Sequence, residues 1–187
     1  MAGSPRIIPR WATHELLAQL ETHRVVSVVG CRQSGKTTIL LKTPLPHVKF
    51  QSLDVQANFS AAVADPSYFV RRRAPDILVI DDIQKVPQLI GEIKFQVDRN
   101  PEKGQYIISG SSDYRKLPQA NESLAGRAGL VRVRTFSEAE QRSMQPGFLQ
   151  ALFDGLLPLS LRFDCSKEMV LETVIRGGYP EILSIKT

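Results

Sequence analysis

Apolar runs alternate with amphipathic stretches along most of this chain, and the alternation predicts its elements. Short apolar or alternating runs favour β-strands, whereas apolar residues at helical spacing favour helices between them. Strands are predicted at residues 25–29, 48–53, 77–80, 105–109 and 130–134, and helices at residues 11–22, 38–42, 57–64, 67–72 and from Pro87 onward. Strands that alternate with helices predict an α/β fold with a doubly wound, mostly parallel five-stranded sheet covered on both faces.

The pattern changes after residue 136. Ser137 and Glu140 have the spacing of a capping box, which predicts the start of a helix. An apolar segment broken by proline and a further helical stretch follow. At 187 residues the chain is long enough for one α/β domain and a small addition. We therefore expect a main domain at residues 1–136, and a helical extension or the start of a truncated C-terminal domain at residues 137–187.

Composition and charge narrow the possible classes of protein. A hydrophobic content of 42% and a charged content of 23% are typical of a soluble globular protein. No apolar run has the length of a membrane span, and the N-terminus lacks the apolar core of a signal peptide. Cys31 and Cys165 are too far apart in sequence to indicate a disulfide framework or a metal site. These features predict a cytoplasmic protein without a membrane partner.

The basic surplus leaves nucleic acid open as a partner. The net charge is +5 and the isoelectric point about 9.4, and the densest basic run is Arg71–Arg73. No aromatic or glycine-rich sequence accompanies that run, as it does in many single-strand binders. A solvated helix end explains the run better than a nucleic-acid contact does, and both interpretations stay open.

The most specific motif lies between the first predicted strand and the following helix. Residues 30–37 match G-x-x-x-x-G-K-[ST] at every fixed position. Backbone N–H groups in such a loop converge on phosphates, and the helix dipole adds positive potential. We expect Lys36 to reach the β- and γ-phosphates and the Thr37 hydroxyl to bind Mg²⁺. The predicted nucleotide-binding residues are Gly30, Cys31, Arg32, Gln33, Ser34, Gly35, Lys36, Thr37 and Thr38.

Two consecutive acids follow the apolar strand at residues 77–80. Asp81 comes at the carboxyl end of that strand, where it can hold Mg²⁺ together with Thr37. Asp82 follows directly and is a candidate to orient or deprotonate the attacking water. A turn or helix cap is the alternative explanation for two acids after a strand. With the phosphate loop upstream, we favour the functional explanation for both, as a metal ligand for Asp81 and as a catalytic group for Asp82.

Two further polar residues lie next to later strands. Ser109, at the end of the fourth strand, is a candidate to contact the γ-phosphate or the water, and a serine–glycine turn is the alternative. Arg127 precedes the fifth strand and is a candidate to stabilise the transferred phosphoryl group, in its own chain or from a neighbouring subunit of a homo-oligomer. A surface arginine is the alternative there. Without a guanine-reading Asn-Lys-x-Asp motif, the expected base is adenine.

Taken together, these motifs resemble the predicted bacterial and archaeal AAA-type ATPases that carry a C-terminal domain of unknown function. The resemblance rests on the segments Val29–Thr38, Ile80–Gln84 with Pro87, Ile107–Ser112, Glu122–Arg127 and Gly177–Glu181. It implies a P-loop NTPase three-layer α/β/α sandwich that binds ATP with Mg²⁺. It also implies that Lys36, Thr37 and Asp81 bind phosphate and metal, that Ser109 is near the sensor position, and that Arg127 is the arginine of a Leu-Ala-Gly-Arg signature.

The chain departs from the pattern of that family at three points. Asp82 stands where members usually have Glu, and the missing methylene shortens its reach by about 1.5 Å. Cys31 stands where proline is common, and members are typically much longer. The expected function is that of an ATP-binding, Mg²⁺-dependent ATPase that acts as an energy or switch module. The alternative is a nucleotide-gated interaction module with little or no hydrolysis, which can associate with nucleic acid.

Overall fold

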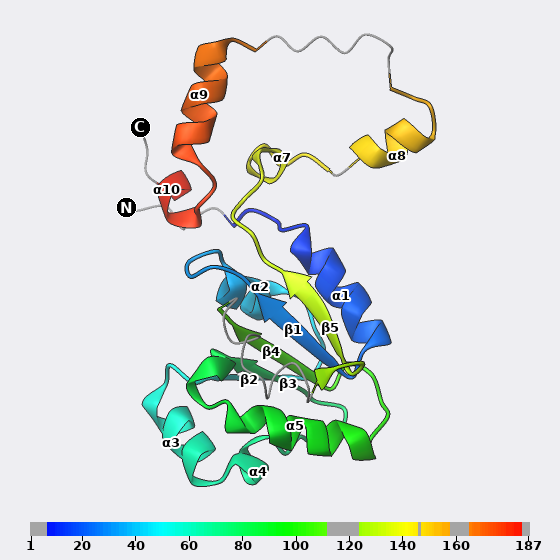
Figure 1. Ribbon diagram of the computed structural model, residues 1–187, viewed down its shortest axis with the longest axis vertical. Coiled ribbons are helices and arrows are strands. Elements are labelled where there is room, and N and C mark those ends of the chain that lie inside the picture. Colours follow the sequence, from blue (N-terminus) through cyan, green and yellow to red (C-terminus); the bar gives the residue numbers. More distant parts are fainter. Residues whose placement is uncertain (1–6, 112–123, 146, 158–164, 185–187) are drawn as a thin grey trace. The chain divides into compact units, whose positions relative to one another are not determined.

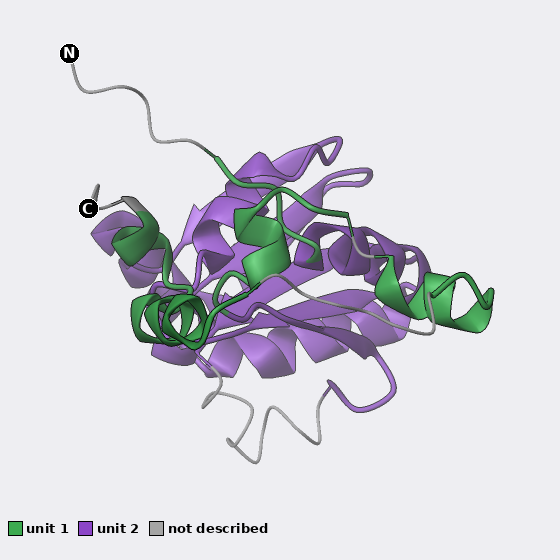
Figure 2. Ribbon diagram, turned by 90° about the horizontal axis from the view of Figure 1, so that it is seen from above, with its two compact units in different colours: residues 1–11, 135–187 green, residues 12–134 purple. Residues whose placement is uncertain are grey.

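A computed structural model describes residues 7–111, 124–145, 147–157 and 165–184 (Figure 1). The chain divides into two compact units (Figure 2). The α/β unit comprises residues 12–134, and the C-terminal unit comprises residues 135–187 together with residues 1–11. Each unit is described by itself.

The α/β unit is built on a five-stranded sheet in which every strand pair is parallel. The spatial order is β2-β3-β4-β1-β5. The strands are β1 (Val25–Val29), β2 (Val48–Ser52), β3 (Ile77–Asp81), β4 (Tyr106–Gly110) and β5 (Ala128–Arg132). Every residue of β1 and β4 is buried, as expected for strands covered on both faces. The predicted α/β fold is therefore confirmed, and the sheet is wholly parallel.

Helices cover both faces of this sheet and form the outer layers of an α/β/α sandwich (Figure 1). On one face, α1 (Ala12–Thr22) and α2 (Lys36–Lys42) pack against alternate strand residues such as Val26 and Val28. On the other face lie α3 (Gln56–Ala64), α4 (Pro66–Phe69), the 3₁₀ turn η1 (Ile83–Lys85) and α5 (Gln88–Arg99). The apolar face of α5 consists of Leu89, Ile90, Ile93 and Val97, all fully buried.

The fifth strand begins two residues earlier than the sequence pattern indicates. β5 starts at Ala128, which is the partner of Val25 in β1. Its second residue, Gly129, is buried, and a Cβ there would lie 2.1 Å from the Gln19 side-chain oxygen on α1. Because glycine has no side chain, it adds no apolar position to the pattern, and the pattern alone could not extend the strand to this point.

The C-terminal unit contains four short helices among its described residues. These are α7 (Glu138–Gln141), α8 (Phe148–Phe153), α9 (Lys167–Arg176) and α10 (Pro180–Ser184). The predicted capping box of Ser137 and Glu140 is present at the start of α7. The other oxygen of the Glu140 carboxylate accepts from Arg10 Nε at 3.2 Å and from the Trp11 backbone N–H at 2.9 Å. One buried carboxylate thus joins α7 to the N-terminal segment.

The tail signature at Gly177–Glu181 has a structural role in the same unit. The Phe136 N–H donates to the Gly178 carbonyl at 2.8 Å, and a Cβ on Gly178 would lie 2.1 Å from the Phe136 carbonyl oxygen. Gly177 has φ 66° and ψ −157°, a region that only glycine adopts readily. Both glycines therefore allow the chain after α9 to pair closely with residue 136. Across the described ranges of the chain, no helix has both the length and the apolar character of a membrane span.

Candidate functional site

The glycine loop connects β1 to α2 in a tight turn, and its fixed glycines have steric reasons. A Cβ on Gly30 would lie 2.1 Å from the Val133 carbonyl oxygen, and Gly35 has φ 93°. Gln33 also has a left-handed backbone, with φ 62°. The Ser34 hydroxyl donates to the Cys31 carbonyl at 2.9 Å, a hydrogen bond within the loop that stabilises the turn. Cys31, Arg32, Gln33, Thr37 and Thr38 are exposed around this loop.

Lys36 directs its ammonium into the loop that it follows. Its Nζ donates to the carbonyl of Gly30 at 3.0 Å and to that of Cys31 at 2.8 Å. Burial lowers the pKa of Lys36, and the carboxylates of Asp82 and Asp81 act in the opposite direction. A cation thus lies at the centre of the loop, with both acids near enough to influence it.

Asp81 joins the loop helix to the sheet. The Thr37 hydroxyl donates to Asp81 Oδ2 at 2.7 Å, and the Ser109 hydroxyl donates to Asp81 Oδ1. Asp81 and Ser109 are buried at the carboxyl ends of β3 and β4, which are neighbours in the sheet. Parallel strands bring their carboxyl ends to one edge, so this meeting follows from the fold. The structure gives Ser109 a contact with Asp81, while its contact with phosphate or water stays a prediction.

Asp82 lies beside these residues in an unusual backbone conformation. It has φ 61° and ψ 45°, the left-handed region that Asp tolerates better than most residues. It precedes η1, and Gln84 Nε2 donates to its Oδ1 at 2.8 Å. The turn thus holds the second acid at the carboxyl edge of the sheet, next to Asp81.

Asp54 is a third acid at this edge, and the sequence analysis missed it. It follows β2 by two residues and forms an ion pair with Lys85 of η1. The hydrogen bond from Lys85 holds the pKa of Asp54 below its usual value, and the Asp54 carboxyl also interacts with that of Asp82. The available signal was its position directly after a predicted strand, the same signal that singled out Asp81.

Arg127 lies at the amino-terminal ends of the strands, opposite the strand ends that carry Asp81 and Ser109. It precedes β5, and its carbonyl accepts from the N–H of Val25, the first residue of β1. Its guanidinium pairs with Asp98 near the end of α5, from Nε to Oδ1 and from a terminal nitrogen to Oδ2 at 3.2 Å. This hydrogen bonding, with that from Lys94, lowers the pKa of Asp98 to about 2. The structure does not bring Arg127 to Lys36, Thr37, Asp81 or Ser109 of its own chain.

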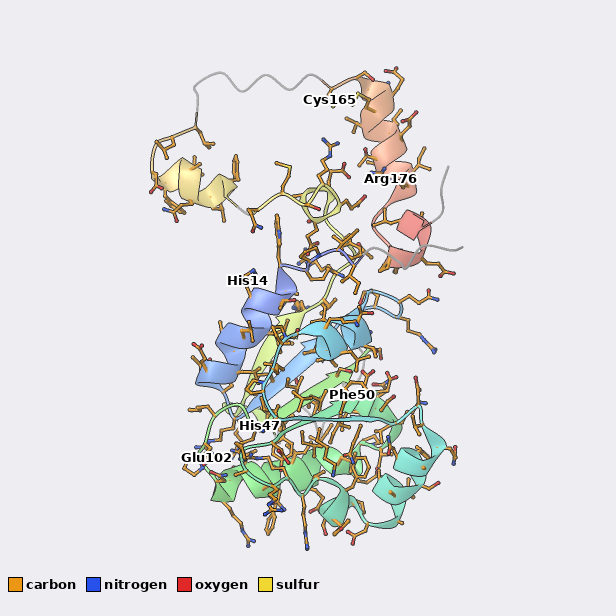
Figure 3. The ribbon with its side chains drawn as sticks, turned by 180° about the vertical axis from the view of Figure 1, so that it is seen from behind. His14, His47, Phe50, Glu102, Cys165 and Arg176 are labelled. Atoms are coloured by element: carbon orange, nitrogen blue, oxygen red, sulfur yellow. The ribbon has the colours of Figure 1, made fainter. Side chains whose placement is uncertain are left out.

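The basic run at Arg71–Arg73 is partly structural. Arg72 is largely buried and donates to the Asp76 carbonyl, to Gln105 and to Glu102, which lies in the turn between α5 and β4 (Figure 3). The Arg71 guanidinium lies 5.7 Å from the centroid of the exposed Tyr68 ring. The run therefore contributes less free positive charge than its sequence indicates. The motif residues Ser112, Glu122 and Ser123 lie outside the described part of the chain.

The donor set of the carboxyl edge fits a magnesium nucleotide. Mg²⁺ prefers oxygen ligands and keeps several waters, and Thr37 and Asp81 offer a hydroxyl and a carboxylate 2.7 Å apart. Phosphate requires cationic and N–H donors, which Lys36 and the start of α2 supply. The close Val133 carbonyl at Gly30 and the left-handed backbone at Gly35 keep the loop in its tight turn.

Comparisons with known proteins agree with this geometry. A family model described as an AAA domain matches residues 22–141. Two uncharacterized proteins, from Mycobacterium bovis and Mycobacterium tuberculosis, are each 33% identical over 125 residues, which is 65% of this chain and 27% of each relative. The matched part of the chain therefore covers about a quarter of the length of those relatives.

Two solved structures share the fold. The Walker-type ATPase of Pyrococcus abyssi superposes with a TM-score of 0.57 at 16% identity and covers 95% of this chain and 66% of its own. DnaA from Aquifex aeolicus superposes with a TM-score of 0.51 at 18% identity, over 91% of this chain and 56% of its own. The loop, the acidic strand end and the family match lead to one conclusion: this chain belongs to the AAA-type P-loop ATPase family.

Proposed function

We propose that this protein binds ATP with Mg²⁺ at the carboxyl edge of its sheet and hydrolyses it to ADP and phosphate. The observation that carries the proposal is the 2.7 Å hydrogen bond between Thr37 and Asp81. It joins the loop helix to the acidic strand end, so that the two expected magnesium ligands come from different elements yet lie in contact. The AMPPCP-bound state of the similar DnaA supports an adenine nucleotide.

Each residue of the site has a role in this proposal. Lys36 and the backbone N–H groups from Gly30 to Thr38 would hold the phosphates, and Thr37 and Asp81 would hold the metal. The ion, when bound, supplies positive charge that offsets the charge on the phosphates. Ser109 orients Asp81 through its hydroxyl. Asp82 would orient the attacking water or accept its proton.

Release of inorganic phosphate from Mg·ATP tests the proposal. We expect steady release by the protein and none by Lys36→Ala, because the loop then lacks its central cation. Omission of Mg²⁺ should stop release as well. Equal phosphate release by the wild-type protein and Lys36→Ala would show that the protein does not hydrolyse ATP.

A second candidate function is a nucleotide-gated interaction module with little hydrolysis. The observation that favours it is the position of Asp82, whose side chain is one methylene shorter than glutamate and accepts a hydrogen bond from Gln84. This candidate predicts ATP binding by isothermal titration without phosphate release, and hydrolysis gained by Asp82→Glu. If Asp82→Glu binds ATP and stays as inactive as the parent, the short side chain is not what limits turnover.

The wider setting of the module is also a proposal. We infer that residues 1–136 supply the nucleotide-dependent step and that residues 137–187 belong to the part that transmits it. Arg127 would act only on a neighbouring subunit, because it lies at the far edge of its own sheet. A cytoplasmic location and a homo-oligomer fit this view. Nucleic-acid binding, if present, should weaken steeply with added salt.

A further inference from the structure

The turn that presents Asp82 is short and needs external support. η1 spans only Ile83–Lys85, and a single 3₁₀ turn has little stability of its own. Its backbone contributes two hydrogen bonds, from Lys85 N–H to the Asp82 carbonyl at 3.0 Å and from Val86 N–H to the Ile83 carbonyl at 3.1 Å. Ile83 anchors the turn in the core. The polar side of the turn depends on side-chain contacts.

Those contacts come from the end of the neighbouring strand β2. The Leu53 N–H donates to the Asp81 carbonyl at 3.1 Å, which ties the residue after β2 to the end of β3. Lys85 Nζ reaches back to the Leu53 carbonyl at 3.5 Å and forms the ion pair with Asp54. The chain from Asp81 to Lys85 is thus closed into a ring by Leu53 and Asp54. Asp82 is one of the residues that form this ring.

Lys85 makes the strongest polar contact with Asp54 in this ring. The Asp54 carboxyl also interacts with that of Asp82, and this side-chain hydrogen bonding helps to hold the pKa of Asp54 below its usual value. Lys85 neutralises Asp54 and draws it toward η1. Arg32 and Lys36 of the glycine loop are the other cations that act on this group of carboxylates. Without Lys85, Asp54 would lose the contact that joins it to η1.

We propose that Asp54 and Lys85 form a positioning pair, which holds η1 and, through it, the Asp82 carboxyl at the edge of the phosphate site. The catalytic part of this inference rests on the proposed function, since Asp82 matters for turnover only if the protein hydrolyses ATP. The pair itself does not touch the nucleotide. It is exposed, with 40% of the Lys85 side chain and 65% of the Asp54 side chain accessible, so it contributes little to global stability.

A matched set of variants tests the pair. Lys85→Met and Asp54→Asn break it, whereas Lys85→Arg keeps a cation in place. Arg142→Met is the control, because Arg142 forms an exposed ion pair with Glu138 in the C-terminal unit. Hydrogen exchange of a peptide covering residues 82–86 reports on the turn directly. We expect faster exchange in Lys85→Met and Asp54→Asn, and wild-type exchange in Lys85→Arg and Arg142→Met.

Kinetics supply the second readout. We expect Lys85→Met and Asp54→Asn each to lower kcat about tenfold or more with an unchanged ATP dissociation constant, because a shift near 1 Å of a catalytic group can cost about 100-fold. The double variant should lose no more than either single one, as partners in one interaction do. Lys85→Arg should restore most of the rate.

The two readouts test the proposed hydrolysis and the positioning pair separately. If the wild-type protein releases no more phosphate than Lys36→Ala, the proposed hydrolysis is lost, and hydrogen exchange still decides whether the pair holds the turn. Unchanged exchange at residues 82–86 in both Lys85→Met and Asp54→Asn would overturn the positioning pair, whatever the rate of hydrolysis. Loss of kcat in Arg142→Met to the same degree would overturn it too.

Discussion

Within each of its two units, the protein is held together by a different kind of contact. The α/β unit buries complete strands between two layers of helices, and its largest apolar cluster spans the sheet, η1 and α5. In the C-terminal unit, α8 and α9 bury no side chain among the described residues. Apolar residues such as Phe153 and Ile175 are each 83% exposed there. This unit is joined mainly by polar and backbone contacts around Glu140, Phe136 and Gly178.

The difference shows which part of the chain specifies its own structure. A buried parallel sheet gains free energy from its own apolar residues, so the α/β unit has its driving force within residues 12–134. The C-terminal unit gains little from burial and depends on a few hydrogen bonds, each of modest net value. We therefore expect equivalent substitutions to have large effects in the first unit and local effects in the second.

Two glycine substitutions give the largest expected contrast. Gly30→Ala and Gly178→Ala each place a Cβ 2.1 Å from a backbone carbonyl oxygen, that of Val133 in the first unit and that of Phe136 in the second. Gly30→Ala distorts the loop and should weaken ATP binding more than about 100-fold, comparable to the loss of a preorganised anion site. Gly178→Ala should leave ATP affinity unchanged and increase proteolysis after residue 135.

Isothermal titration and limited proteolysis on the same samples measure both effects. Loss of ATP binding in Gly178→Ala, with the α/β unit still folded by circular dichroism, would contradict the expectation that this glycine acts only within its own unit. Normal ATP binding in Gly30→Ala would contradict the steric account of the loop.

Isoleucine substitutions compare the two kinds of packing directly. Ile93 on α5 is fully buried, whereas Ile175 on α9 is 83% exposed. Ile93→Ala should cost about 2–5 kcal/mol of unfolding free energy, because it removes buried methyl groups and leaves a cavity. Ile175→Ala should change it by no more than about 0.5 kcal/mol. Urea unfolding followed by circular dichroism measures both, and a cost above 2 kcal/mol for Ile175→Ala would mean that α9 is covered in solution.

Acid should loosen the C-terminal unit before the α/β unit. Burial raises the pKa of Glu140, but hydrogen bonds from Ser137, Trp11 and Arg10 outweigh it, so the pKa lies below its ordinary value. A group with a depressed folded pKa contributes stability above its unfolded pKa, about 4.3, and this stability is lost as pH falls through the folded value. Trp11, the single tryptophan, reports on the contact, since its backbone N–H donates to Glu140.

The fluorescence of Trp11 should therefore change as pH falls below about 4.3. Glu140→Gln should abolish that transition, because the amide does not titrate in this range. Glu138→Gln is the matched control, since Glu138 forms exposed ion pairs with Arg142 and with Arg176 on α9 (Figure 3). An acid transition that persists unchanged in Glu140→Gln would show that another group controls the unit.

Most of the α/β unit and the centre of its site could be predicted from the sequence. Apolar runs specify buried strands, and a parallel sheet brings every strand end to one edge, so Thr37, Asp81 and Ser109 meet without further information. By the same rule, the amino-terminal ends of all strands lie together at the opposite side of the sheet from the site. Arg127 precedes β5, and its distance from the loop was therefore implied by the parallel sheet.

Other features depend on contacts between distant parts of the chain. The ion pair of Asp54 and Lys85 joins residues 31 positions apart, and neither has a motif of its own. The role of Gly178 appears only when its backbone faces Phe136. In the C-terminal unit the apolar residues of α8 and α9 follow a helical pattern, yet pattern alone does not say whether a partner covers them. Sequence therefore predicts the unit that packs upon itself better than the unit that does not.

The smallest expected effect on stability concerns Arg127, and kinetic measurements on the same variant separate two roles for this residue. Its pair with Asp98 is exposed, and exposed ion pairs contribute little to stability, so Arg127→Ala should shift the thermal midpoint only slightly. If Arg127 acts on a neighbouring subunit, Arg127→Ala should abolish phosphate release while ATP binding persists. Adding the Lys36→Ala protein to it should then restore part of the activity, because each supplies what the other lacks. If Arg127 is only a surface ion pair, Arg127→Ala and Asp98→Ala should both hydrolyse ATP at the wild-type rate, because the far edge of the sheet does not reach the site.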